Sequence, residues 1–152
     1  MARLYAQRGR ELWCVQLQRP FAFQSPFADE RYALWLHVVD PEITKEEREA
    51  LCDAIAASPC RYAVTSGQDH DLWHDLLDES YLAKQPDGQP QDEDFLMTAG
   101  KDTAADAAYF LVRLTAYEDF RARRMLVLVV GGDDEEPARV AAPALTELRD
   151  DD

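Results

Sequence analysis

The residues best suited to chemistry are two histidines one helical turn apart, in the segment His70-Asp-Leu-Trp-His74. Imidazoles at this spacing share one face of a helix, and in H-E-x-x-H segments they bind zinc while the acid activates water. Here the acid is Asp71, one methylene shorter than glutamate. The only other histidine, His37, falls inside a predicted strand, so a third ligand would have to be a carboxylate. A divalent metal bound by both histidines is one hypothesis, and a structural role for both is the other.

A second group of candidates is expected at the carboxyl ends of the predicted strands. Open α/β folds bind ligands at that edge, where helix N-termini attract anions. Acids at the same edge would oppose an anion unless a divalent cation were present. Turn formation also accounts for these residue types. The candidate ligand-binding residues are Asp40, Ser66, Gly67, Asp69, Thr98 and Lys101.

Motifs for nucleotide binding and nucleophilic catalysis are missing from the sequence. No GxGxxG follows a predicted strand, and in Gly100-Lys-Asp-Thr103 the lysine is not followed by serine or threonine as in a P-loop. The Ser66-Gly67 pair is not part of a GxSxG elbow. We therefore predict no catalytic residue and no cofactor, and a divalent metal stays as the open alternative.

The elements that must position these residues alternate between strands and helices. Thr44 and Glu47 form a capping box for a helix to about Ala57, and Asp69 is placed to cap the next helix. A third helix is expected from Thr103 to about residue 118. Apolar runs predict strands at residues 11–18, 32–39, 62–65, 95–98 and 125–130.

This alternation predicts an α/β fold, a three-layer α/β/α sandwich with a mainly parallel, roughly five-stranded sheet. No crossover helix separates the first two strands, so the first strand should lie at an edge or run antiparallel. We assign residues 1–135 to a single domain and residues 136–152 to an acidic, partly helical or frayed tail. Pro143 argues against a long helix in that tail.

The net charge of −14 limits the classes of partner. Such a surface repels phosphate backbones and anionic membranes, so we expect neither nucleic-acid nor membrane binding. Either the acids serve solubility alone, or they attract a basic partner protein.

Three cysteines without a CxxC spacing argue against a disulfide framework and against a zinc ribbon. No apolar run approaches the roughly 20 residues that span a bilayer, and the N-terminus lacks the apolar segment of a signal peptide. We expect buried thiols and a cytoplasmic location.

The aromatic segment around Phe21, Phe23 and Phe27 contains two prolines and cannot form a helix. Loop aromatics usually pack on their own domain, and the alternative is an exposed contact for a partner or for a second copy. The sequence is compatible with a monomer and with a homodimer through these three residues.

Several short segments resemble a group of small uncharacterised bacterial α/β domains, a domain of unknown function. The similarity extends over residues 32–131 and implies an α/β fold in a bacterial cytoplasm. It implies no activity, because none is established for that group. The segments are Cys60-Arg-Tyr, Ser66-Gly67, Trp73-His74, Asp78-Glu79, Asp106-Ala-Ala and Phe110-Leu111.

The first functional hypothesis is a non-catalytic protein-interaction or regulatory module, of the immunity or defence kind. The alternative is an enzyme that binds a small ligand, nucleotide or metal at the carboxyl end of the sheet.

Overall fold

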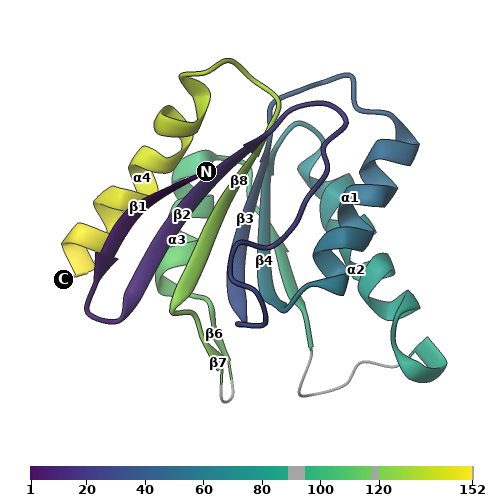
Figure 1. The fold of residues 1–152 in the computed structure, drawn as a ribbon, viewed down its shortest axis with the longest axis horizontal. Helices are drawn as coiled ribbons and strands as arrows, with labels where there is room; N and C mark the ends of the chain where they lie inside the picture. Colours follow the sequence, from purple (N-terminus) through teal and green to yellow (C-terminus); the bar gives the residue numbers. More distant parts are fainter. Residues whose placement is uncertain (89–94, 118–119, 152) are drawn as a thin grey trace.

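The computed structural model describes residues 1–88, 95–117 and 120–151. Within these residues one six-stranded sheet carries helices on both faces (Figure 1). Its strands are β1 (Ala2–Gln7), β2 (Arg10–Leu17), β3 (Tyr32–Val38), β4 (Cys60–Gly67), β5 (Met97–Gly100) and β8 (Arg124–Val130). They lie in the order β1-β2-β8-β3-β4-β5, and only the edge strand β1 is antiparallel to its neighbour. The predicted α/β fold with a mainly parallel sheet is confirmed.

The helices of the described residues divide the core into two halves. Helices α1 (Lys45–Ala57) and α2 (His70–Ala83) cover one face of the sheet, and α3 (Ala104–Arg113) and α4 (Glu136–Asp151) cover the other (Figure 1). The crossover from β5 to β8 through α3 passes behind β4 and β3, which places β8 beside β3. A short 3₁₀ turn, η1 (Pro86–Gly88), follows α2.

Helix α1 begins where the capping box predicts. The Thr44 hydroxyl accepts the backbone N–H of Glu47, and the Glu47 carboxylate accepts the N–H of Thr44. These two bonds satisfy N–H groups that have no partner within the helix. Leu51 and Ile55 of the same helix are buried against the sheet, so capping and burial select the same helix.

Strand β1 is an addition to the predicted elements, and it makes the sheet six-stranded rather than five-stranded. Only Tyr5 of β1 is buried, because the strand lies at the edge and shows most of its side chains to water. Its sequence therefore lacks the apolar alternation that indicates a strand. Pairing with β2 through a turn at Arg8 and Gly9 forms it, and both turn residues have positive φ.

The third predicted helix is shorter than expected. Helix α3 ends at Arg113, and the buried Thr115 donates its hydroxyl hydrogen to the carbonyl of Leu111, which closes the last turn. The chain then forms the hairpin strands β6 (Ala116–Tyr117) and β7 (Phe120–Arg121). The predicted end at residue 118 lies outside the described residues.

The expectation that Pro143 prevents a long C-terminal helix is wrong, because α4 runs through it for 16 residues. Proline removes one helical N–H, but this helix gains more by packing on the sheet. Its buried residues are Val140, Ala141, Ala144 and Leu148.

The aromatic segment between β2 and β3 lies over the α1 and α2 side of the sheet (Figure 1). Phe21 and Phe27 are buried, and Phe23 is half-buried against the same cluster. The Phe27 ring lies 5.3 Å from the ring of Tyr32 and 6.0 Å from that of Trp13. These phenylalanines leave little apolar surface to a partner.

No helix of the described residues is long and apolar enough to cross a membrane. The cysteines Cys14, Cys52 and Cys60 are buried and unpaired. Burial raises the pKa of Cys14 to about 11, and those of Cys52 and Cys60 to about 12. All three are therefore thiols at neutral pH, and the neutral thiol is the unreactive form.

Candidate functional site

The carboxyl ends of β3 and β8 form the topological switch point of the sheet. β3 continues towards α1 on one face, and β8 continues towards α4 on the other. In open α/β folds, ligands bind in the crevice between two such strand ends. This is the edge to which the sequence assigned the candidate ligand-binding residues.

Here the two strand ends are in direct contact. The backbone N–H groups of Val39 and Asp40 both donate to the carbonyl of Val130, at 2.9 and 3.2 Å. Gly131 has a φ of +85°, and a Cβ built on it would lie 2.6 Å from the Cβ of Asp40. A side chain does not fit between these loops, and a ligand does not fit either.

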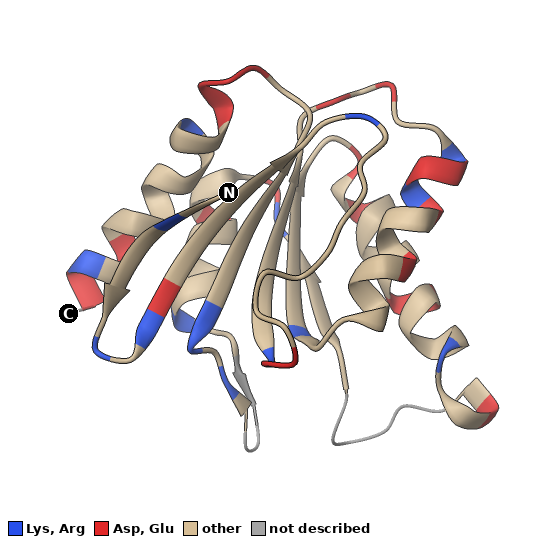
Figure 2. Ribbon diagram, in the orientation of Figure 1, with Lys and Arg blue, Asp and Glu red and all other residues tan. Residues whose placement is uncertain are grey.

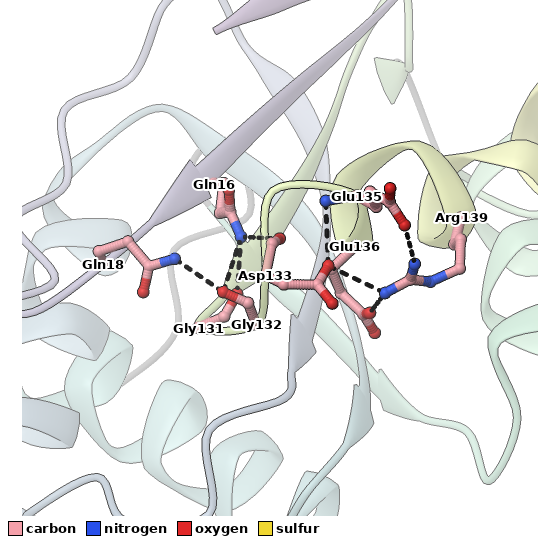
Figure 3. A network of polar contacts seen from close by, with 8 residues as sticks. All are labelled: Gln16, Gln18, Gly131, Gly132, Asp133, Glu135, Glu136 and Arg139. Carbon is pink, nitrogen blue, oxygen red and sulfur yellow. Dashed lines mark hydrogen bonds and ion pairs between the residues drawn. The ribbon is translucent and has the colours of Figure 1, made fainter.

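The loop that follows β8 is held by two glutamine side chains (Figure 3). Gln16 Nε2 donates to the carbonyls of Gly131, Gly132 and Asp133, at 3.0, 3.3 and 2.8 Å. Gln18 Nε2 donates to the carbonyl of Gly132 at 2.9 Å. Gln16 belongs to β2 and Gln18 follows its last residue, so the end of this strand fixes the loop that leads into α4. Sequence reasoning assigned no role to either glutamine.

Arg139 of α4 closes the same network from the helix side (Figure 3). Its guanidinium lies 3.0 Å from the carboxylate of Asp133 and 3.3 Å from that of Glu135, and it also contacts Glu136. One cation thus contacts three carboxylates. The backbone N–H of Glu135 and Arg139 together lower the pKa of Asp133.

Buried beneath this edge is a chain of hydrogen bonds through Ser66. Trp35 Nε1 donates to Ser66 Oγ at 2.7 Å, and Ser66 Oγ lies 2.7 Å from His37 Nδ1. Since the indole can only donate, the serine hydroxyl hydrogen is free to point at His37, whose own proton then sits on Nε2. Burial lowers the pKa of His37, against an opposing influence of Glu136. The site therefore holds a neutral, oriented imidazole.

His37 borders a shallow hollow of about 340 Å³ on the side of the sheet that carries α3 and α4. Gly67 also borders this hollow, and the position requires glycine because φ is +87° and a Cβ would lie 2.2 Å from the carbonyl oxygen of Val38. Ser66 is fully buried and does not reach the hollow surface. The lining residues are His37, Val38, Val39, Gly67, Gln68, Asp69 and Glu136.

The two histidines of α2 lie on the opposite face, beside β5. The Thr98 hydroxyl donates to Asp78 at 2.6 Å and lies 3.0 Å from His74 Nε2. His70 Nε2 lies 3.2 Å from Asp102, a different partner. His70 Nδ1 is also within ion-pair distance of Asp71, at 3.2 Å, although the angle does not make this a hydrogen bond.

Among the described residues, no group of three His, Cys, Asp or Glu side chains is arranged to hold a metal ion. The spacing of His70 and His74 does direct both rings towards β5, as one helical face requires. Each ring then meets different neighbours, so the pair shares no further ligand.

The remaining predicted residues serve the local structure. Asp40 accepts the backbone N–H of Glu42 and lies 3.5 Å from Arg19. Lys101 Nζ lies 4.9 Å from the ring centre of Phe110. Asp69 is the residue before α2, but its side chain makes no capping bond, because a left-handed φ of 54° turns it away. The predicted cap at Asp69 is wrong for this reason.

The structure thus separates the sequence-predicted residues. Ser66, Gly67 and Asp69 lie close to His37 on one face, Thr98 lies with His74 on the other, and Asp40 lies at the closed switch point. Sequence reasoning did not identify His37 as a site residue. His37 lies two residues after Trp35 in β3, so both side chains point to the same face of the sheet. The register of β3 on β4 pairs His37 with Ser66, and with that register known the sequence would have identified His37.

Charge is the property that the whole edge shares. In Figure 2 the loops after the strands are mainly red at the top, and blue gathers at the opposite end of the sheet. Asp71, Asp102 and Glu135 have side chains 90, 92 and 84% exposed. The acids of this carboxyl edge are Asp40, Glu42, Glu46, Glu47, Asp69, Asp71, Asp102, Asp106, Asp133, Asp134, Glu135 and Glu136.

Comparison with known proteins places the chain in a family without assigning an activity. No curated protein and no solved structure matches it. A family model described as Domain of unknown function (DUF7684) matches residues 12–146, which confirms the resemblance to a domain of unknown function. This match covers well over half of the sequence, and the chain therefore belongs to the DUF7684 family.

Proposed function

We propose that this domain is a non-catalytic protein-interaction module that binds a basic partner protein through the acidic carboxyl edge defined above. The observation that carries the proposal is the excess of exposed carboxylates over free cations at this edge. Such a surface steers a positively charged partner and repels nucleic acid and anionic membranes. Immunity and defence proteins that neutralise a basic partner belong to this class.

Part of the acidity has a structural explanation. Helices α1 to α4 of the described residues all start at this edge, and first-turn acids stabilise the positive end of the helix dipole. That explanation covers Glu46, Asp71 and Asp106, which lie in first turns. It does not cover Asp102 and Asp134, which lie outside the helices.

The cations of the same edge are already engaged within the domain. Arg19 lies 3.5 Å from Asp40 and 3.2 Å from Glu47. Arg139 contacts three carboxylates, and Lys101 lies over an aromatic ring. The charge that faces solvent is therefore negative, and the glutamine-held loop presents it in a fixed arrangement, which lowers the entropy cost of binding.

The test compares two variants of equal charge. The edge variant carries Asp71→Asn, Asp102→Asn, Asp133→Asn and Glu135→Gln, and the control carries Glu49→Gln, Asp53→Asn, Asp75→Asn and Glu79→Gln on the outer faces of α1 and α2. Each protein is cross-linked in lysate of its own cells at salt concentrations between about 0.05 and 0.5 M, and captured polypeptides are quantified.

The expected result is one basic polypeptide captured by the wild type and the control at low salt, lost steeply as salt rises and absent with the edge variant. Equal capture by all three proteins, or capture that ignores salt, would show that the edge acids do not bind a partner. Circular dichroism confirms that both variants fold.

A second candidate function is small-ligand binding at the hollow beside His37. A neutral imidazole held by Ser66, with its Nε2 proton directed away from that bond, is able to donate to a ligand. Native mass spectrometry of protein purified from its own cells tests this. A bound mass of tens to hundreds of daltons in the wild type, absent from His37→Asn, would support it, and bare protein in both would contradict it.

A further inference from the structure

Arginines gather at the opposite edge of the sheet, where the strands begin (Figure 2). They come from the β1–β2 turn, the start of β2, strand β7 and the residue pair before β8. Together they border a hollow of about 450 Å³, here named the arginine hollow. It is lined by Arg8, Gly9, Arg10, Arg121, Ala122 and Arg123.

One of these arginines is fixed in place. Arg10 Nη2 donates to the carbonyl of Val112 at 2.6 Å, and Nη1 lies 3.1 Å from Asp151. Its Nε is buried and has no hydrogen-bond partner in the described part of the chain. A second hollow of about 450 Å³ adjoins on the α3 side and shares Arg10 and Arg121 with the first. Arg10 is thus a rigid cation between two open spaces.

Two other arginines, Arg121 and Arg123, have solvent-facing charges. Neither Arg121 nor Arg123 forms an ion pair or a side-chain hydrogen bond with any residue that the structure describes. Burial lowers the pKa of Arg10, Asp151 opposes that shift, and the charges of Arg121 and Arg113 lower the pKa further. Within the arginine hollow, the guanidinium groups of Arg10 and Arg121 therefore repel each other, and an anion between them would relieve the repulsion.

We propose that the arginine hollow binds the phosphate groups of a small anionic molecule that carries a pyrophosphate group, free or as an ester. Guanidinium forks match phosphate oxygens in pairs, and several arginines around one hollow favour a doubly charged group over a single carboxylate. The volume lies in the range of small-molecule sites. An extended polyanion fits less well, because the net charge of −14 repels the parts of it beyond the hollow.

This site lies at the other end of the strands from the acidic carboxyl edge, so it does not depend on the proposed protein partner. Its role would be ligand-dependent control of whatever the acidic edge binds, or retention of a phosphorylated ligand for its own sake. Either role requires the same binding chemistry, and the experiment addresses that chemistry alone.

Isothermal titration with inorganic pyrophosphate tests the proposal on three proteins at equal salt. The site variant is Arg121→Gln with Arg123→Gln, and the control is Arg19→Gln with Arg139→Gln, which removes the same charge at the opposite edge. We expect saturable one-to-one binding to the wild type and the control, and affinity lower by about tenfold or more in the site variant.

Three outcomes would overturn the proposal. The first is no saturation of the wild type up to about 10 mM pyrophosphate. The second is equal weakening in both variants, which would reduce the effect to net charge. The third is tighter binding of a short single-stranded oligonucleotide than of pyrophosphate, which would replace the small ligand by nucleic acid.

Discussion

Replacing Ser66 by alanine tests the buried hydrogen-bond chain that orients His37. Ser66 and Trp35 are both 0% exposed, and Ser66 Oγ lies 2.7 Å from Trp35 Nε1 and 2.7 Å from His37 Nδ1. Alanine keeps the backbone and the packing of Cβ but removes the oxygen. The indole N–H then stays buried without an acceptor, and His37 loses the group that fixes its ring.

The magnitude follows from these two losses. A buried donor left without a partner costs about 1–3 kcal/mol of stability. His37 is half-buried, so its ring can turn towards water and its loss is smaller. We expect a decrease of about 2–3 kcal/mol in the free energy of unfolding, which corresponds to roughly 4–12 °C in Tm for a chain of this size.

Urea unfolding at constant m-value measures this decrease, and a double-mutant cycle assigns it. A Trp35→Phe background has no indole N–H that could lose its acceptor. There Ser66→Ala should lower the free energy of unfolding by about 1–2 kcal/mol less than it does in the wild type. Ser80→Ala, a half-buried serine of α2, is the matched control and should change stability by less than about 0.5 kcal/mol. An equal cost of Ser66→Ala in both backgrounds would refute the reasoning.

Three further predictions concern the edge and its helices. Gly131→Ala should destabilise by about 2–4 kcal/mol in thermal unfolding, and Gly9→Ala by only about 1 kcal/mol, because both have positive φ but only Gly131 meets Asp40; equal losses would contradict this. Thr44→Ala should cost about 1 kcal/mol by denaturant titration, and no loss would show the capping box to be neutral. Burial lowers the pKa of His37 below its ordinary 6.5, so the unfolded chain binds more protons just below that pH and stability falls as pH drops through it. Between about pH 7 and 5, the free energy of unfolding should fall less steeply with decreasing pH for His37→Asn than for the wild type. Identical slopes of stability against pH would contradict the lowered pKa of His37.

Signals within one turn or one strand predicted most of the helices and the central strands. The capping box at Thr44 and Glu47 acts over three residues, and it starts α1 where the sequence indicates. The apolar run at Met125–Val130 is buried on both faces as β8, between two other strands. Such signals are legible in sequence because the interacting groups are neighbours along the chain.

Features that depend on a partner distant in the chain could not be predicted from the sequence. Edge strand β1 buries only Tyr5 and exists through its pairing with β2. Helix α4 passes through Pro143 because its inner face packs on the sheet, and local propensity gives no measure of that packing. Asp69 sits at a helix start but has a left-handed backbone conformation, and its side chain makes no capping bond.

The sequence by itself determined the fold class, the acidic charge and the positions of most elements. Only the tertiary structure decided which polar residues meet: the register of β3 on β4 brings His37 to Ser66, and the strand order closes Gly131 onto Asp40. The physical reason is that strand order and register minimise a free energy summed over the whole sheet, so no single segment encodes them. The arginine hollow has the same origin, because its cations come from segments that are more than a hundred residues apart in the chain.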